Sequence, residues 1–325
     1  THVERLWLLC LAYASATATP TTPLVVLLFV TPLVVGDGTC KARLASQVDH
    51  NCAIQLADDT LVCWGQNNAG QSTPPSDQFS YVAAGEANSI GILASDGTPR
   101  IWGPDGGDGI VNNLPTAVAS KAIDIGPWHG CLLRADTHAA QCWGYNRYGQ
   151  GNPPAPLSTP YSEIHTSKYI SCGLREADAL IVCWAWGMSS AMAAVSFSTF
   201  EIGYNDHMCG LRQANGFAAC WRGNTNHDPP VELQSVAFSA VTVGNGHFCA
   251  LTQADHTARC WGTNDRGQAT VPDTSVPYLA ITAGHSHTCA VRASDGGVDC
   301  WGRNDNGQTT VPAGLIACAP PPPLP

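Results

Sequence analysis

Charge is scarce in this sequence, and lysine is especially rare. Of 325 residues only 12% are charged, the formal net charge is −10, and the lysines are limited to Lys41, Lys121 and Lys168. A nucleic-acid-binding surface requires clustered lysine and arginine to neutralise phosphates. The composition therefore predicts no nucleic-acid partner.

Long helical patterns and the short motifs of common enzymes are also absent. The 32 glycines and 23 prolines recur too often for long helices and are typical of short strands joined by turns. There is no Gly-x-Ser-x-Gly, no His-Glu-x-x-His and no phosphate-binding glycine loop, and the acidic residues are scattered. These absences predict a protein that is not an enzyme and that needs no cofactor.

A repeated phrase, Cys-Trp-Gly with variants, is present instead. Its tryptophans follow one another at intervals of 37 to 41 residues and are Trp64, Trp102, Trp143, Trp184, Trp221, Trp261 and Trp301. A unit of about forty residues cannot bury a hydrophobic face alone, but stacked neighbours can. Seven copies therefore predict seven similar units in a closed ring.

Twelve of the fifteen cysteines form pairs with a spacing of eleven residues. The pairs are Cys52/Cys63, Cys131/Cys142, Cys172/Cys183, Cys209/Cys220, Cys249/Cys260 and Cys289/Cys300, and the second repeat has Ile90 and Ile101 at both equivalent positions. Opposed residues of an antiparallel hairpin lie near the Cα separation that a disulfide requires. Zinc sites usually show Cys-x₂₋₄-Cys knuckles, which are missing here. We therefore predict six hairpin disulfides, no metal and an oxidising compartment.

Each repeat has the same order of segments. An apolar stretch precedes a glycine-containing loop, a second strand carries the first cysteine, and a third strand after an Asp-Gly type of turn ends in Cys-Trp-Gly. A closing turn, Asn-x-x-Gly-Gln, leads to the next unit. Helical solenoids and leucine-rich arrays share this period. The Val/Ile/Cys/Trp strands and Asp-Gly turns favour β blades.

The predicted domain boundaries follow from the repeats. Residues 1–39 form a signal-like, apolar N-terminal segment, residues 40–318 the seven repeats, and residues 319–325 a proline-rich tail or linker start. Thr1–Ala18, which includes Cys10, resembles a signal peptide. The alternatives are that Leu24–Val35 is the signal core, or that the N-terminal segment is buried outside the propeller. Cys40 and Cys318 bracket the repeats, and in a closed ring we expect them to be bonded.

The repeats resemble those of the regulator of chromosome condensation superfamily. The pattern is Gly-x-x-His-x-Cys/Ala followed by Trp-Gly-x-Asn-x-x-Gly-Gln, complete at Trp64, Trp143, Trp261 and Trp301. Repeats four and five depart from it, at Trp184-Ala185-Trp186-Gly187 and Trp221-Arg222-Gly223-Asn224. The resemblance covers about 280 residues. It implies an all-β, seven-bladed β-propeller.

The function implied by this resemblance is binding. Members of the superfamily include a nuclear exchange factor that binds chromatin, ubiquitin-ligase propellers, crinkly-type receptor-kinase ectodomains and a secreted inhibitor of β-lactamases. The paired cysteines are similar to those of the receptor ectodomains. We expect a secreted or extracellular, non-enzymatic propeller that binds a protein of unknown identity and reaches a membrane only through an attached segment outside this chain. The alternatives are a glycan-binding or hydrolytic propeller and an exchange-factor or ubiquitin-ligase accessory propeller.

Residues repeated in most blades are expected to be structural. His50, His129, His207, His247 and His287 precede the first cysteine of five repeats by two residues. We expect their imidazoles to bond to loop backbone, although a ligand or pH-sensing role is an alternative. The repeated tryptophan is expected to pack between adjacent blades with its N–H satisfied.

Function is expected where the repeats differ. The position three residues before the first cysteine reads Asp49, Ala87, Trp128, Tyr169, Asp206, Gly246 and Ser286. In the similar secreted inhibitor, loop aromatics at this register contact the partner, which implies Trp128 and Tyr169 as binding residues. The neighbouring Glu86, Lys168 and Asn205 are expected to complete the patch. The small and acidic residues elsewhere argue against a β-lactamase target. The alternative is that Trp128 and Tyr169 only cover loop backbone.

Overall fold

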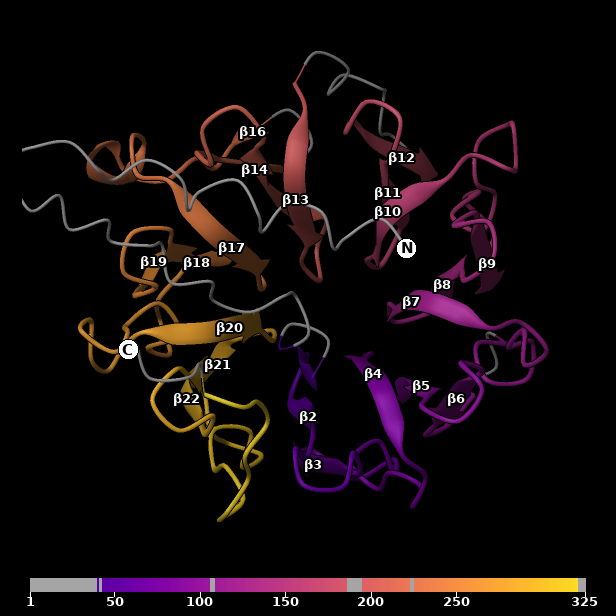
Figure 1. Ribbon diagram of the computed structural model, residues 1–325, viewed down its shortest axis with the longest axis horizontal. Coiled ribbons are helices and arrows are strands. Elements are labelled where there is room, and N and C mark those ends of the chain that lie inside the picture. Colours follow the sequence, from indigo (N-terminus) through magenta and orange to yellow (C-terminus); the bar gives the residue numbers. More distant parts are fainter. Residues whose placement is uncertain (1–39, 41–42, 106–108, 186–194, 223–224, 321–325) are drawn as a thin grey trace, which may run out of the picture. The chain divides into compact units, whose positions relative to one another are not determined.

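The structure is a computed structural model that describes residues 40, 43–105, 109–185, 195–222 and 225–320. These residues form seven antiparallel sheets arranged as the blades of a propeller (Figure 1). The all-β, seven-bladed fold predicted from the sequence is confirmed. The signal-like segment, with Cys10 and the apolar run Leu24–Val35, lies outside the described residues, as do Trp186 and Gly187 of repeat four, Gly223 and Asn224 of repeat five, and residues 321–325 of the tail. No helix among the described residues has the length and hydropathy of a membrane span.

Each blade presents its first strand to the centre of the ring (Figure 1). Most of these strands alternate buried apolar residues, packed between neighbouring blades, with polar residues. The first strands are β1 (Leu44–Gln47), β4 (Phe79–Ala84), β7 (Ser120–Ile125), β10 (Tyr161–Thr166), β13 (Phe197–Ile202), β17 (Phe238–Val243) and β20 (Tyr278–Ala283).

The second and third strands complete each blade and form the predicted hairpins. The second strands are β2 (His50–Ile54), β5 (Ser89–Leu93), β8 (His129–Arg134), β11 (Ile170–Arg175), β14 (His207–Arg212), β18 (His247–Thr252) and β21 (His287–Arg292). The third strands are β3 (Leu61–Gly65), β6 (Pro99–Trp102), β9 (Ala140–Gly144), β12 (Ile181–Ala185), β15 (Ala218–Arg222), β19 (Ala258–Gly262) and β22 (Val298–Gly302). Blade five adds β16 (Thr225–Asn226), and a 3₁₀ turn, η2 (Val231–Leu233), precedes blade six.

The hairpin register opposes the two cysteines of each pair. In blade seven Cys289 of β21 lies across from Cys300 of β22, and the same relationship holds in the other five cysteine-bearing blades. All six predicted hairpin disulfides are formed, which confirms the pairing read from the spacing. The bonds are Cys52–Cys63, Cys131–Cys142, Cys172–Cys183, Cys209–Cys220, Cys249–Cys260 and Cys289–Cys300.

The two cysteines of a bridge differ in burial. The first cysteine of every pair is fully buried, because the second strand lies between the first and third strands of its blade. The second cysteine lies on the outer strand and is partly buried in five bridges, at Cys63, Cys142, Cys183, Cys260 and Cys300. Cys220 is the exception and is 1% exposed, in the blade whose third strand is covered by β16. In blade two the register opposes Ile90 and Ile101, so an apolar pair occupies the place of a bridge.

The hydrophobic core is divided among the interfaces between blades. Each buried cluster combines residues of two adjacent blades, as where Trp301 of blade seven packs with Cys249, Leu251 and Ala258 of blade six. The indole Nε1 of Trp301 donates to the Gln268 carbonyl of the preceding closing turn at 3.0 Å. Equivalent bonds are made by Trp64, Trp102, Trp143, Trp184 and Trp261. The predicted packing of the repeated tryptophan is confirmed at these six positions.

Four of the five repeated histidines also bond to the next blade. His50, His129, His247 and His287 are fully buried, and their Nε2 atoms lie 2.7–3.1 Å from Ser89, Ser171, Thr288 and Asn51 respectively. The expectation that these rings bond to loop backbone is therefore wrong, because the partner is a side chain. His207 instead makes edge-to-face contacts with His227 and Phe248.

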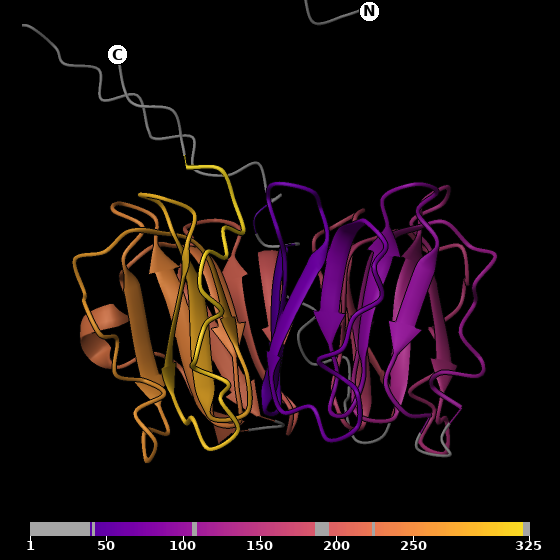
Figure 2. The same cartoon turned by 90° about the horizontal axis from the view of Figure 1, so that it is seen from below.

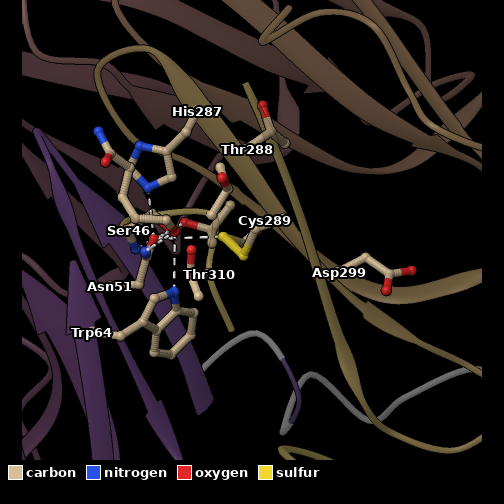
Figure 3. The surroundings of a disulfide bond; sticks show 12 residues. Ser46, Asn51, Trp64, His287, Thr288, Cys289, Asp299 and Thr310 are labelled. Atoms are coloured by element: carbon tan, nitrogen blue, oxygen red, sulfur yellow. Dashed lines mark hydrogen bonds between the residues drawn. A yellow bond between two sulfur atoms is a disulfide. The ribbon is translucent and has the colours of Figure 1, made fainter. Parts of the chain in front are cut away.

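The ring closes between blades seven and one. Cys40 is bonded to Cys318, as predicted, and Asn51 Nδ2 and Trp64 Nε1 both donate to the Gln308 carbonyl, at 2.8 and 3.0 Å. Figure 3 shows this junction, with His287 directed at Asn51 beside the disulfide of Cys289. The first and last blades are thus joined by the same kinds of contact that join blades six and seven, plus one additional disulfide.

Candidate functional site

One end of the ring gathers the residues in which the blades differ. Strands within a blade are antiparallel, so the loop from first to second strand and the turn after the third strand lie at the same end; the side view in Figure 2 shows the strands running between the two ends. We call this end the loop face. Its first-to-second-strand loops are residues 48–49, 85–88, 126–128, 167–169, 203–206, 244–246 and 284–286.

An aromatic cluster lies on the loop face over blades three and four. Trp128 is 5.5 Å from Tyr169 and 5.7 Å from Tyr145, and Tyr148 is 5.8 Å from Tyr169 and 6.0 Å from Tyr145, measured between ring centroids. All four contacts are edge-to-face, so the four rings form a closed cycle. The four side chains are half-buried. This geometry is a favourable arrangement of aromatic quadrupoles and fixes the rings relative to one another.

Local backbone bonds hold the rings of the cluster in place. The Tyr145 N–H donates to the Trp128 carbonyl at 2.9 Å, which ties the closing turn of blade three to its first loop. The Tyr148 N–H donates to Oε1 of the buried Gln150 at 3.0 Å. Gln150 is the last residue of the Trp-Gly-x-Asn-x-x-Gly-Gln motif, so the repeated motif supplies the scaffold and its variable positions supply the aromatic side chains.

Lys168 lies between these rings and a fifth one. Its Nζ is 4.9 Å from the ring centroid of Trp128, 5.3 Å from that of Tyr169 and 5.9 Å from that of Tyr204. All three distances fall within the roughly 6 Å range of cation–π attraction. Lys168 therefore connects the aromatic cluster of blades three and four with the loop of blade five.

Glu86, Tyr204 and His285 meet although they come from blades two, five and seven. The Tyr204 hydroxyl lies next to the Glu86 carboxylate, and the pKa of Tyr204 is raised by burial and then by that negative charge. The Tyr204 ring lies 5.5 Å from the His285 ring in an edge contact. Since blades two and five are not adjacent, this contact crosses the centre of the ring. These three side chains converge over the mouth of the central channel.

Asn205 faces another loop. Its Nδ2 donates to Asn245 Oδ1 at 2.7 Å, and Asn245 Nδ2 lies 2.8 Å from Nε2 of His285. Asn205 thus links blade five to blades six and seven. Of the five side chains predicted as a binding patch, Trp128, Tyr169 and Lys168 are brought into direct contact, and Glu86 adjoins them through Tyr204. Asn205 instead bonds to Asn245 in the loop of blade six.

Sequence reasoning missed Tyr145, Tyr148, Tyr204 and His285. Tyr145 and Tyr148 carried a signal, because among the four complete copies of the closing motif only the copy at Trp143 has aromatic residues at its variable positions. Tyr204 carried no such signal in the sequence. The blade-five loop Gly203–His207 is one residue longer than its equivalent Gly284–His287, so Tyr204 has no counterpart when the loops of the repeats are aligned.

The central channel contains a second group of polar side chains. Asp124 accepts bonds from the Thr166 N–H and hydroxyl, at 2.6 and 3.1 Å, and burial raises the pKa of its carboxyl. Glu163 similarly accepts bonds from Thr199 and the Phe200 N–H, both at 3.1 Å. Each carboxylate therefore bridges its own inner strand to that of the next blade.

The channel is too small to be a substrate site. The cavity between the inner strands has a volume of about 90 Å³, with Asp124, His165 and Glu201 among its lining residues. Small-molecule sites usually occupy ~300–1,000 Å³. Within the described ranges, no three His, Cys, Asp or Glu side chains are grouped to hold a metal ion. The arrangement of these carboxylates supports a role in joining blades.

Comparison with known proteins identifies the repeats. The regulator of chromosome condensation (RCC1) repeat family matches residues 238–268 and 279–308, which correspond to blades six and seven. This agrees with the resemblance found in the sequence and shows RCC1-type repeats in blades six and seven.

Solved structures with the same architecture include two plant receptor ectodomains. The CRINKLY WD40 ectodomain of the Arabidopsis thaliana receptor kinase ACR4 is 22% identical, with a TM-score of 0.67 over 82% of this chain and 97% of that one. The ectodomain of the Physcomitrella patens receptor kinase CR4 is 23% identical, with a TM-score of 0.65 over 80% and 73%. Yeast RCC1 (Prp20), solved with Kap60, is 13% identical, with a TM-score of 0.58 over 82% and 81%. At these identities the similarity shows the fold.

Proposed function

We propose that this chain is a secreted or extracellular, non-enzymatic propeller that binds a partner protein through the loop face. The observation that carries the proposal is the aromatic cluster of Trp128, Tyr145, Tyr148 and Tyr169. Tyrosine and tryptophan supply large, rigid contact area at interfaces and are enriched among the residues that dominate binding energy. The cluster is confined to two of seven blades, which is the pattern expected for one protein interface rather than one sugar site per blade.

Two features support the extracellular assignment. Six hairpin disulfides and the Cys40–Cys318 bond form and persist in an oxidising compartment. Receptor ectodomains are among the propellers with this architecture. An exchange factor or a ubiquitin-ligase accessory would act where thiols are kept reduced, so the cysteine content favours the extracellular alternative.

The test is an affinity capture with the oxidised propeller as bait. Extracellular fractions would be passed over the wild-type protein and over Trp128→Ala/Tyr169→Ala, and bound proteins would be identified and their affinities measured. We expect the double variant to bind its partner at least about tenfold more weakly, since interface aromatics commonly contribute more than ~2 kcal/mol.

The control is Val231→Ala. Val231 is 79% exposed in the 3₁₀ turn η2, so its substitution removes exposed apolar surface while leaving the aromatic cluster intact. We expect this variant to bind like the wild type. Equal partner affinity in the wild type and in the folded double variant would contradict the assignment of the loop face.

A further inference from the structure

The ammonium of Lys168 is held by aromatic rings. The chain has a second lysine among the described residues, Lys121, whose Nζ pairs with Glu176 Oε1 at 3.5 Å. Lys168 Nζ has no carboxylate oxygen within 4.0 Å in the described ranges, and its close contacts are the rings of Trp128, Tyr169 and Tyr204. An ammonium that is neither paired nor fully hydrated is here stabilised by the negative faces of three rings.

The surrounding rings have the geometry of a cation-binding cage. Trp128 and Tyr169 are inclined to one another at 72° and Tyr148 and Tyr169 at 80°, so their faces turn toward different sides of a shared space. We propose that Trp128, Tyr169 and Tyr204 form an aromatic cage that Lys168 occupies in the free protein, and that a lysine or arginine side chain of the partner protein takes its place on binding. This inference rests on the proposed function and gives the partner its chemistry.

Charge complementarity favours a cationic occupant. Asp206 accepts a hydrogen bond from Ser167, the neighbour of Lys168, and Glu86 lies next to Tyr204, so two carboxylates border the cage. The whole chain carries a formal net charge of −10, which attracts basic partners and repels acidic ones. Recognition of ammonium groups is the best attested use of aromatic cages in proteins.

Exchange of one cation for another costs little. Lys168 is half-buried and lies in the short loop of residues 167–169, so its ammonium can return to water when another cation enters. The rings are meanwhile fixed by their edge contacts and by backbone bonds of the closing turn, and the cage needs no reorganisation. The intrachain lysine competes with any incoming cation. Removing it should therefore expose a vacant cation site.

The experiment uses n-butylammonium, which reproduces a lysine side chain, and the whole oxidised chain. Binding to the wild type, Lys168→Ala and Lys168→Met would be followed by tryptophan fluorescence and by the shift in Tm, with ionic strength held constant using sodium chloride. We expect saturable binding to Lys168→Ala, at least about threefold tighter than to the wild type, because cation–π contacts are worth ~0.5–2 kcal/mol. Lys168→Met fills the cage with an uncharged chain of similar length and should bind as weakly as the wild type.

Three controls make the result specific. The isosteric neutral probe n-butanol should not bind Lys168→Ala saturably, Lys121→Ala should behave like the wild type, and Lys168→Ala/Trp128→Ala should lose the site. Saturable butanol binding, equal butylammonium affinity in the wild type and Lys168→Ala, or no binding to folded Lys168→Ala would each overturn the proposal. Near-UV circular dichroism establishes that each variant is folded.

The outcome is separable from that of the capture experiment, because the probe assay contains no partner protein. If a partner requires Trp128 and Tyr169 while Lys168→Ala shows no cation site, the proposed function stands and the cage is rejected. If the cation site is present but no partner depends on these rings, the cage stands and the protein-binding function is rejected.

Discussion

His287 donates its Nε2 proton to Asn51 Oδ1 across 2.7 Å, joining the last blade to the first. The direction is fixed by chemistry, since an amide oxygen only accepts and Asn51 Nδ2 is used on the Gln308 carbonyl. The same logic applies where the histidine meets a hydroxyl: the Ser89 proton is donated to the Gln71 carbonyl at 3.0 Å, so His50 Nε2 must be the donor. Because their Nδ1 atoms are buried without a partner and burial lowers their pKa, these imidazoles are neutral at pH 7, with the proton on Nε2.

Acid is predicted to destabilise the propeller between about pH 6.5 and pH 4. Nδ1 of His50, His129, His247 and His287 is buried without an acceptor, and burial lowers the pKa to about 4, or about 3 for His287. The unfolded chain binds these protons from its ordinary pKa of 6.5 downward, so the stability present above that pH is lost as pH falls toward the folded value. At ~1.4 kcal/mol per pKa unit, each histidine costs on the order of 3 kcal/mol by pH 4.

Urea unfolding midpoints measured from pH 7.5 to 4.5 would show this loss as a steady decline below pH 6.5. The matched control is His129→Gln, which removes one titrating group and should flatten the curve even if it lowers stability at pH 7.5. A midpoint that stays constant from pH 7 to 4.5 would contradict the assignment of neutral buried imidazoles.

Blade two predicts how a hairpin disulfide can be replaced. Ile90 and Ile101 oppose one another where other blades have cystine, and Ile90 is fully buried. Replacing Cys249 and Cys260 together by isoleucine should preserve the fold and cost about 2–3 kcal/mol, the chain-entropy value for so short a loop. Cys249→Ser alone should cost more, because serine fills less of the buried space than isoleucine and Cys260 is left as a free thiol. The free energies of unfolding of the two variants would be compared. Equal losses of stability would argue against the idea that packing of the two isoleucines replaces the disulfide.

The closing disulfide is predicted to contribute more than any hairpin disulfide. Cys40 and Cys318 are 278 residues apart, whereas the hairpin pairs are eleven apart. In the chain-entropy model this raises the stabilisation from about 3 to about 5–6 kcal/mol. Cys40→Ser/Cys318→Ser should therefore lower the free energy of unfolding about twice as much as removal of the Cys289–Cys300 bridge. Losses of equal size in equilibrium unfolding would show that the interblade contacts already constrain the ends.

Gly284 is predicted to be required because the His287 ring packs against it. A Cβ at this position would lie inside the 3.0 Å limit from three atoms of a ring that is fully buried and bonded to Asn51. Gly284→Ala should lower the free energy of unfolding by about 1–3 kcal/mol, the usual cost of overpacking. Gly70→Ala is the control, since nothing lies within 4 Å there and only its positive φ of 80° is strained. If Gly70→Ala is equally destabilising in urea unfolding, collision with His287 is not the cause.

The sequence predicted the construction of a blade well because blade contacts are local. Cys289 and Cys300 are eleven residues apart in one hairpin, so spacing alone placed them opposite one another. The indole of Trp301 was correctly expected between blades, since a large apolar group repeated in every unit has nowhere else to be buried. The histidines were misjudged because their partners lie in the next blade, 39 to 42 residues away for His50, His129 and His247 and 236 residues away for His287.

At two blade interfaces, the two residues that face each other are either both polar or both apolar. His247 of blade six meets Thr288 of blade seven. In blade four Ile170 takes the place of the histidine, and Met208 of blade five takes the place of the threonine. A polar pair is exchanged for an apolar pair, so at these two interfaces no histidine Nε2 or facing hydroxyl is left without its partner. The sequence contains both residues of each pair but does not indicate that they touch.

The sequence by itself determined the repeat length, the three-stranded hairpin unit, its disulfides and the ring closure, because each depends on spacing along the chain or on the residues that bracket the repeats. Only the tertiary structure decided which loop residues meet. Lys168 reaches Trp128 and Tyr204, and Tyr204 reaches Glu86 three blades away, because ring closure brings the loops of separate blades over one axis. That convergence is a property of the closed ring, and no local pattern encodes it.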